Sequence, residues 1–206
     1  TSRDRVVELC EAIRASGSRI AWKAQGRAVP VDLEMFRAMR AAGCSTFSIG
    51  VESGSPRILE ALDKRVTVEQ IERAFRLARE AGLWRVGFFM VGCPGEREED
   101  FARTAALLDR LDPDMIQVAF FTCYPGSPAF ERHVAGGPVP GWSAFQHYES
   151  YLNLSAEPDE VVAGWQRRLY RQFIGRPSYL LRYLRLKNVN LALNARDAME
   201  GMGRLE

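Results

Sequence analysis

Three segments of the chain share one order of features, and this repeat restricts the fold more than anything else in the sequence. They are AIRASGSRIAWKAQGR, AMRAAGCSTFSIGVESG and LAREAGLWRVGFFMVGCPG. Each is typical of a helix end, a glycine, a strand and a glycine-bearing loop. Alternating helices and strands predict an α/β fold with a parallel sheet and right-handed crossovers. The sheet is either doubly wound or barrel-like, and in both cases ligands bind at the carboxyl ends of the strands.

Apolar residues mark the strands and the helices between them. The third strand, RVGFFMV, has almost no polar alternation, so both of its faces are expected to be buried. Strands are predicted over residues 19–24, 45–51, 85–91 and 115–121. Helices are predicted over residues 3–16, between Asp32 and Gly43, over 56–62, between Thr67 and Gly82, and over 98–111.

Caps and buried faces follow from the same segments. Asp32 is a suitable N-cap, and Thr67 with Gln70 forms a capping box. Helical spacing predicts inward-facing residues in four helices: Val6, Leu9, Cys10 and Ile13; Leu33, Phe36 and Met39; Ile71, Ala74, Phe75 and Ala78; Phe101, Ala105, Leu108 and Leu111.

The character of the chain changes after about residue 136. Residues 136–141 resemble a linker, residues 142–154 are aromatic and irregular, and residues 158–202 are predicted as helices broken near Gly175 and Pro177. We therefore expect a barrel part over residues 1–135 and, over 136–206, a linker with a helical extension that packs on the sheet.

Composition excludes several classes of protein. Hydrophobic residues make up 47% and charged residues 26% of the 206 residues, which is typical of a globular domain. No run of eighteen apolar residues and no signal peptide occurs, so a cytoplasmic location is expected. A net charge of +2 does not favour nucleic acid as a partner. The four cysteines form no C-x-x-C pair and are expected to be reduced thiols.

The loops that follow the predicted strands carry the candidate binding residues, but not hydrolytic or phosphate-binding motifs. Both histidines lie beyond the repeats, and no phosphate-loop motif is present. The loops offer a carboxylate, a hydroxyl, a cation and open backbone groups, which suit a zwitterionic, nucleoside-like ligand. The candidates are Gln25 and Arg27, Glu52 and Ser53, Lys64 and Arg65, the turn from Gly92 through Pro94 to Glu96, and Phe121 to Gly126.

Three ordered stretches make a family resemblance specific. They are SIGVESGSPRILEALDKRVTVEQIERAFRLAREAG, GFFMVGCPGE and VAFFTCYPGSPAFE. Together they resemble the later half of the radical S-adenosylmethionine (SAM) core. They are most similar to the branch that carries a cobalamin-binding domain ahead of the barrel, including proteins like the anaerobic magnesium-protoporphyrin ester cyclase. The tail AGWQRRLYRQFIGRPSYLLRYL also resembles that branch. The resemblance implies a partial (β/α)6 barrel, of which this chain holds strands three to six, with a helical extension.

The same resemblance implies roles for the loop residues. Phe88 stands where relatives have an acidic residue for the ribose, so that contact is not expected. The implied SAM contacts are Glu52 and Ser53 for the ribose or amino-acid part, Lys64 rather than Arg65 for the carboxylate, residues 87–92 for packing against adenine, the backbone of Phe121 and Thr122 for the adenine edge, and Gln25 and Arg27 for cofactor or substrate.

The resemblance also implies a [4Fe–4S] cluster that this chain does not hold. The family's C-x-x-x-C-x-x-C loop is absent, and the four scattered cysteines cannot replace it. We therefore expect no metal ligands and no catalytic activity in this chain alone. The cluster loop and a cobalamin domain are expected upstream, in a full-length enzyme that generates a 5′-deoxyadenosyl radical. Expected partners are that N-terminal part, a small and hydrophobic substrate, and a second copy paired through an open sheet edge.

Other interpretations remain open at the level of sequence. Related radical SAM activities include methylthiolation and ring cyclisation. A non-catalytic α/β module could instead bind a partner through its basic helices, because residues 166–187 hold seven arginines or lysines and no acidic residue. Such a stretch suits either an anionic membrane surface or an ordinary solvated helix face. A barrel enzyme that binds a phosphorylated metabolite is a further alternative.

Overall fold

The computed structural model describes residues 2–134, 141, 145, 152–182 and 184. The chain divides into two compact units, residues 1–170 and 171–206. Three predicted parts lie outside the described residues: the linker over 136–141 except residue 141, most of the irregular stretch over 142–154, and the helix predicted beyond residue 184. The predicted division at residue 135 stays a prediction.

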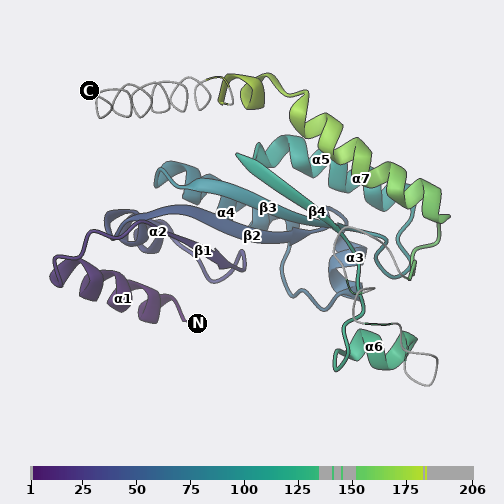
Figure 1. The fold of residues 1–206 in the computed structure, drawn as a ribbon, viewed down its shortest axis with the longest axis horizontal. Coiled ribbons are helices and arrows are strands. Elements are labelled where there is room, and N and C mark those ends of the chain that lie inside the picture. Colours follow the sequence, from purple (N-terminus) through teal and green to yellow (C-terminus); the bar gives the residue numbers. More distant parts are fainter. Residues whose placement is uncertain (1, 135–140, 142–144, 146–151, 183, 185–206) are drawn as a thin grey trace, which may run out of the picture. The chain divides into compact units, whose positions relative to one another are not determined.

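The first unit is built on a four-stranded sheet (Figure 1). All neighbouring strands are parallel and their spatial order follows the chain, β1-β2-β3-β4. A doubly wound sheet reverses its strand order, whereas a barrel does not, so this order indicates the barrel-like alternative. The predicted partial barrel of about four strands with outer helices is confirmed. The strands are β1 (Trp22–Gly26), β2 (Cys44–Glu52), β3 (Trp84–Val91) and β4 (Met115–Phe120).

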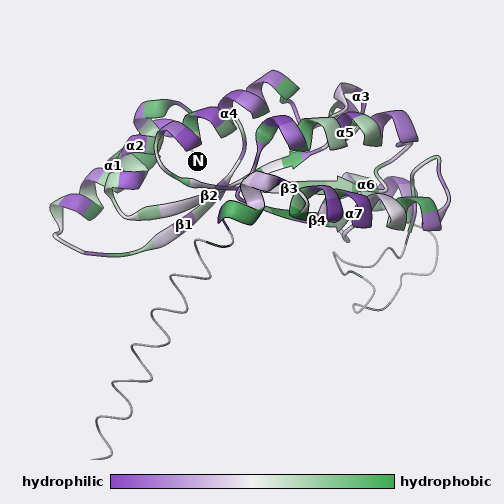
Figure 2. Ribbon diagram, turned by 90° about the horizontal axis from the view of Figure 1, so that it is seen from above, coloured by the Kyte–Doolittle hydropathy of each residue, from purple (hydrophilic) through white to green (hydrophobic). Residues whose placement is uncertain are grey.

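Helices cover one face of the sheet, as Figure 2 shows for α1, α2, α4 and α5. The core lies between this layer and the strands, where Phe36, Phe75, Phe89 and Phe101 are fully buried. The helices are α1 (Arg3–Ala15), α2 (Leu33–Ala41), α3 (Pro56–Ala61), α4 (Val68–Glu80) and α5 (Glu98–Leu111).

The predicted caps and most of the predicted buried faces are confirmed. The Asp32 carboxylate accepts the N–H of Met35 at 2.8 Å, and Thr67 and Gln70 form the reciprocal capping box. Every residue predicted to face inward from α4 and α5 is buried. In α1, however, Leu9 is 50% exposed and Cys10 alone is fully buried. In α2, Met35 is buried while Leu33 is only half-buried, because the face that packs is rotated relative to the predicted stripe.

Two strand predictions need correction. β1 begins at Trp22 rather than residue 19, because its pairing with β2 begins at Trp22 and Cys44. β3 is buried on one face only: Arg85, Gly87, Phe89 and Val91 are buried, while the residues between them are half-buried. The second face of β3 borders an open cavity instead of another layer of helices. A strand that lines a ligand cavity can thus have the uniform apolar composition of a strand buried on both sides.

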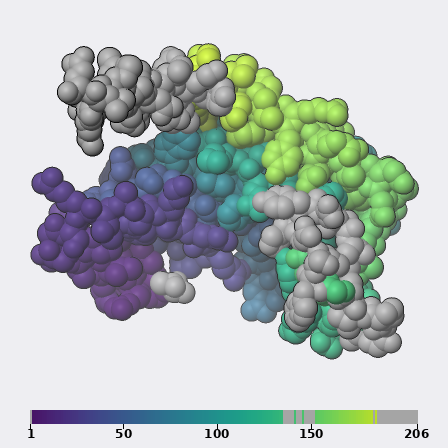
Figure 3. Space-filling view, in the orientation of Figure 1, coloured from purple at the N-terminus to yellow at the C-terminus, as the bar shows by residue number. Residues whose placement is uncertain are grey.

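The outer edge of β4 is covered by α7 (Asp159–Ile174). The N–H of Val118 donates to the Tyr170 hydroxyl at 3.0 Å, and the Gln166 amide donates to the Val118 carbonyl at 3.0 Å. Figure 3 shows the green surface of α7 adjoining the teal surface of the β4 region. Side chains therefore occupy backbone groups that would otherwise be free to pair with another strand.

The short helix α6 (Pro128–His133) was not predicted. It begins at Ser127, whose hydroxyl accepts the N–H of Phe130 at 3.1 Å, and it has proline at its first position. Six residues are too few for apolar periodicity to show. Within the described parts of the chain, no helix is long and apolar enough to cross a membrane.

Candidate functional site

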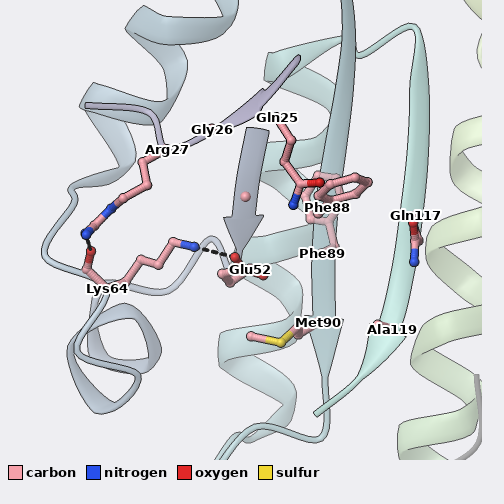
Figure 4. A pocket seen from close by; sticks show the side chains of 11 residues that line it. Gln25, Gly26, Arg27, Glu52, Lys64, Phe88, Phe89, Met90, Gln117 and Ala119 are labelled. Carbon is pink, nitrogen blue, oxygen red and sulfur yellow. Dashed lines mark hydrogen bonds and ion pairs between the residues drawn. The ribbon is translucent and has the colours of Figure 1, made fainter. Parts of the chain in front are cut away.

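A cavity of about 710 Å³ lies on the sheet face that the helix layer leaves uncovered (Figure 4). Residues from all four strands contribute, mostly near the carboxyl ends, where parallel α/β folds bind ligands. Sheet register sets Gly50, Phe88 and Gln117 in one row across β2, β3 and β4. The lining consists of Gln25, Gly26, Arg27, Gly50, Glu52, Lys64, Phe88, Phe89, Met90, Gln117 and Ala119.

An ion pair between Glu52 and Lys64 lies at the wall of the cavity. The Lys64 ammonium donates to Glu52 Oε1, and the side chains are only 16% and 20% exposed for Glu52 and Lys64, respectively. Glu52 ends β2 with a φ of 63°, at a register shift between Gly50 and Glu52. Positive φ is uncommon for a residue other than glycine and is concentrated at functional sites.

Glycine at position 50 leaves room for this pair. A Cβ atom there would lie 2.6 Å from Glu52 Oε1 and 2.8 Å from the Lys64 ammonium nitrogen. Both distances are far below ordinary van der Waals contact, so any side chain would push the two charged groups aside. The absence of a Cβ thus keeps the carboxylate and the ammonium accessible from the cavity.

The structure brings four of the nine predicted site residues together. Gln25, Arg27, Glu52 and Lys64 all line the cavity. Ser53 does not: it is fully buried, and its hydroxyl lies 3.1 Å from that of Thr104 on α5. The strand end places Ser53 next to Glu52 in sequence, but the chain turns it toward the helix layer.

The predicted turn after β3, from Gly92 to Glu96, is held by hydrogen bonds to one of its own side chains. Glu96 Oε2 accepts the N–H groups of Gly92 at 2.8 Å and Cys93 at 3.1 Å. Residues 154 and 156 add backbone bonds to the same turn, at 2.7 Å to the Gly95 N–H and at 2.9 Å to the Glu96 carbonyl. Gly92 is buried and Pro94 half-buried, and neither lines the cavity.

The two predicted residues after β4 also lie outside the cavity lining. Phe121 and Thr122 are half-buried, and the Phe121 N–H donates to the Val91 carbonyl at 2.9 Å. This bond extends the pairing of β3 and β4 by one residue. The predicted SAM contacts of both residues stay predictions.

Among the uncharged cavity residues that sequence reasoning missed, Gln117 and Gly50 matter most for the site. Gln117 lies on β4, across the cavity from Glu52 (Figure 4). Gly50 leaves space in front of the ion pair. The available signal for Gln117 was a single amide inside the apolar strand MIQVAFF. Gly50 gave no signal, because its importance depends on where the side chains of Glu52 and Lys64 point.

Burial raises the pKa of Glu96 to about 7, against two backbone hydrogen bonds that lower it. Its second carboxyl oxygen, Oε1, is buried and lacks a hydrogen-bond partner. Because the folded-state pKa lies above the value near 4.5 of the unfolded chain, the protonated form stabilises the fold. This contribution is complete below the unfolded pKa and is lost as the pH rises through the folded pKa.

We therefore expect the free energy of unfolding to fall by roughly 2 kcal/mol between about pH 5 and about pH 8 because of Glu96. Glu96→Gln keeps an acceptor for the two N–H groups and cannot ionise, so its stability should change much less over this range. Urea unfolding followed by circular dichroism at several pH values measures both. Parallel pH profiles for the original protein and Glu96→Gln would show that another group controls this dependence.

The four cysteines do not fit an iron–sulfur cluster. All are buried and none forms a disulfide bond; they lie on α1, on β2 and in the loops after β3 and β4. Burial raises the pKa values of the Cys10, Cys44 and Cys93 thiols, whereas cluster ligands are thiolates. Among the residues that the structure describes, no three His, Cys, Asp or Glu side chains are grouped to hold a metal ion.

Two known proteins are similar to this chain over most of its length. The chain is 30% identical to an uncharacterised methyltransferase of Pyrococcus horikoshii over 88% of this chain and 40% of that protein. It is 29% identical to the anaerobic magnesium-protoporphyrin IX monomethyl ester cyclase of Cereibacter sphaeroides over 64% of this chain and 22% of that protein. The chain thus spans less than half the length of either relative.

A solved structure and a family model agree with these relatives. The radical SAM methyltransferase TsrM of Kitasatospora setae, solved with cobalamin and a [4Fe–4S] cluster bound, is similar with a TM-score of 0.55 and 23% identity. The similarity covers 62% of this chain and 26% of TsrM, and it shows a shared fold. The model of the Radical SAM superfamily matches residues 1–108, more than half of the chain. The chain therefore belongs to the radical SAM superfamily.

Proposed function

We propose that this chain is the SAM-binding part of a radical SAM enzyme and that the ion pair of Glu52 and Lys64 receives the amino-acid end of SAM. The observation that carries the proposal is this pair of opposite charges, directed toward each other at the cavity wall (Figure 4). Membership of the superfamily supports SAM as the ligand. The two charges support this position for its amino-acid end.

The cavity fits a zwitterion better than a singly charged ligand. An ammonium group can bind the Glu52 carboxylate while a carboxylate group binds Lys64, so that all four charges are paired. A phosphate could pair with Lys64 or Arg27, but it offers no cation to Glu52, whose carboxylate would lose its partner in a poorly hydrated place, which is unfavourable. The space left by Gly50 lets a ligand approach both charges from one side.

The remaining lining has groups for the nucleoside part. Gln25 and Gln117 offer amide donors and acceptors for ribose hydroxyls or a base edge, and Phe88 and Met90 offer apolar surface for a base or a hydrophobic substrate. Bound SAM would supply a 5′-deoxyadenosyl group, and a [4Fe–4S] cluster would supply the electron for cleavage of its sulfonium. The residues of this chain bind and orient SAM, and the cluster thiolates belong to another part of the protein.

For the whole protein we propose a cobalamin-dependent oxidative cyclase or methyltransferase. The relatives named as a methyltransferase and a cyclase, and the fold shared with TsrM, support this choice. The test uses the full-length gene product, purified without oxygen, and measures bound iron, sulfide and cobalamin and the cleavage of SAM to 5′-deoxyadenosine. A reconstituted protein without a cluster and without cleavage would contradict the proposal.

SAM binding tests the part played by this chain. We expect Glu52→Gln to weaken SAM binding by about tenfold or more, because it removes a charge-assisted hydrogen bond to the ligand. Glu60→Gln, an exposed glutamate on α3, is the matched control and should bind like the original chain. Isothermal titration calorimetry measures all three. Equal affinities for the two variants, or no binding to the original chain at about 1 mM SAM, would contradict the proposal.

A further inference from the structure

The turn that carries Lys64 has an unusual backbone. Lys64 lies between Asp63 and Arg65, which have φ values of 47° and 51° although neither is glycine. Such conformations are unfavourable by themselves and persist only where surrounding contacts hold them. One such contact comes from the preceding helix α3, where the Leu59 carbonyl accepts the Lys64 N–H at 2.9 Å.

The second backbone contact comes from Arg27, just beyond the end of β1. A guanidinium nitrogen of Arg27, Nη2, donates to the Lys64 carbonyl, from a residue 37 positions earlier in the chain (Figure 4). Both polar backbone groups of Lys64 are therefore bonded, one to α3 and one to the segment that follows β1. The pKa of Asp63 is lowered mainly by its hydrogen bond to Arg65, and to a smaller extent by the nearby charge of Arg27.

We infer that Arg27 is a positioning residue, which binds the Lys64 carbonyl and thereby places the Lys64 ammonium for the carboxylate of the ligand. This inference rests on the proposed binding of SAM at Glu52 and Lys64. A lysine side chain is long and flexible, so its ammonium is well placed only if its backbone is fixed. Arg27 fixes that backbone from the segment that follows β1, and its effect on binding passes through Lys64.

A double-mutant cycle separates this role from direct contact with the ligand. Arg27→Met should weaken SAM binding about tenfold in the original chain and less than about twofold when Lys64→Met is already present. Decarboxylated SAM lacks the group that Lys64 receives, so Arg27→Met should leave its affinity nearly unchanged. Arg27→Lys keeps one donor and should recover part of the SAM affinity.

Two outcomes would overturn the inference while leaving the proposed function intact. Arg27→Met could weaken SAM and decarboxylated SAM equally, or it could act as strongly beside Lys64→Met as alone. Either result would mean that Arg27 contacts the ligand directly or supports the fold. Failure of the original chain to bind both compounds would instead overturn the proposed function, and the inference with it.

Hydrogen exchange tests the structural half of the inference without a ligand. The Arg27→Met chain should exchange the amides of residues 63–66 several-fold faster than the original chain, because one of the two hydrogen bonds to the Lys64 backbone is lost. Arg19→Met, an exposed arginine ahead of β1, is the control and should leave these amides unchanged. Unchanged exchange in Arg27→Met would contradict a positioning role.

Discussion

Gly54→Ala is expected to lower the free energy of unfolding by about 3 kcal/mol. A Cβ atom on Gly54 would lie 2.5 Å from the Arg103 carbonyl oxygen and 2.7 Å from Thr104 Cα. Both are backbone atoms of α5, so no side-chain rotation can relieve the clash. The Gly54 N–H also donates to the Thr104 hydroxyl at 2.9 Å, and moving the loop away would break this buried bond.

Gly164→Ala is the matched control for this substitution. Gly164 lies inside α7, and a Cβ atom added there would meet no neighbouring group within 4 Å, so alanine should stabilise the helix by up to about 1 kcal/mol. Urea unfolding monitored by circular dichroism should therefore show opposite changes for the same chemical substitution. A Gly54→Ala protein as stable as the original would show that the loop after β2 does not depend on its fit against α5.

Trp165→Ala is expected to cost about 3 to 4 kcal/mol of stability. Trp165 is only 3% exposed, and its ring stacks on Phe101 of α5 with centroids 5.0 Å apart and planes 4° apart. Its indole N–H donates to Glu98 at 2.6 Å. The indole therefore joins α7 to the helix layer by both apolar contact and a hydrogen bond.

Two further variants test how much of this loss of stability comes from the aromatic contact and how much from the hydrogen bond. Trp165→Phe keeps an aromatic ring against Phe101 but loses the bond to Glu98, so its stability should be intermediate. Val161→Ala, at a position of α7 that is 37% exposed, should cost less than about 1 kcal/mol. Thermal and urea unfolding measure all three. If Trp165→Ala were as mild as Val161→Ala, α7 would not depend on this contact.

The parts of the fold that could be predicted are those governed by local chemistry. The capping box of Thr67 and Gln70 and the apolar stripe that follows it define α4 almost completely. The start of β1 could not be predicted, because it depends on where Cys44 of the neighbouring strand begins to pair. The half-exposed face of β3 could not be predicted either, because apolar residues line a cavity as readily as a core.

The candidate site could likewise be predicted only in part. Parallel strands bring their carboxyl ends to one edge, so the meeting of Gln25 and Glu52 followed from the topology. Lys64 lies between two helices, and the family resemblance placed it at the same site. The direction of each side chain did not follow from the topology, and Ser53 turns into the helix layer although it is adjacent to Glu52. The bond between Arg27 and the Lys64 carbonyl joins loops 37 residues apart, and no sequence pattern records such a contact.

The coverage of β4 by Gln166 and Tyr170 makes the two sides of the sheet unequal. One terminal strand, β4, is covered by side chains at Val118, and β1, at the other end of the sheet, pairs with β2 within the described part of the chain. We expect an added strand to join beside β1, where the register of β1 restricts its alignment. In protein engineering terms, a split-protein complementation design should add its strand on the β1 side.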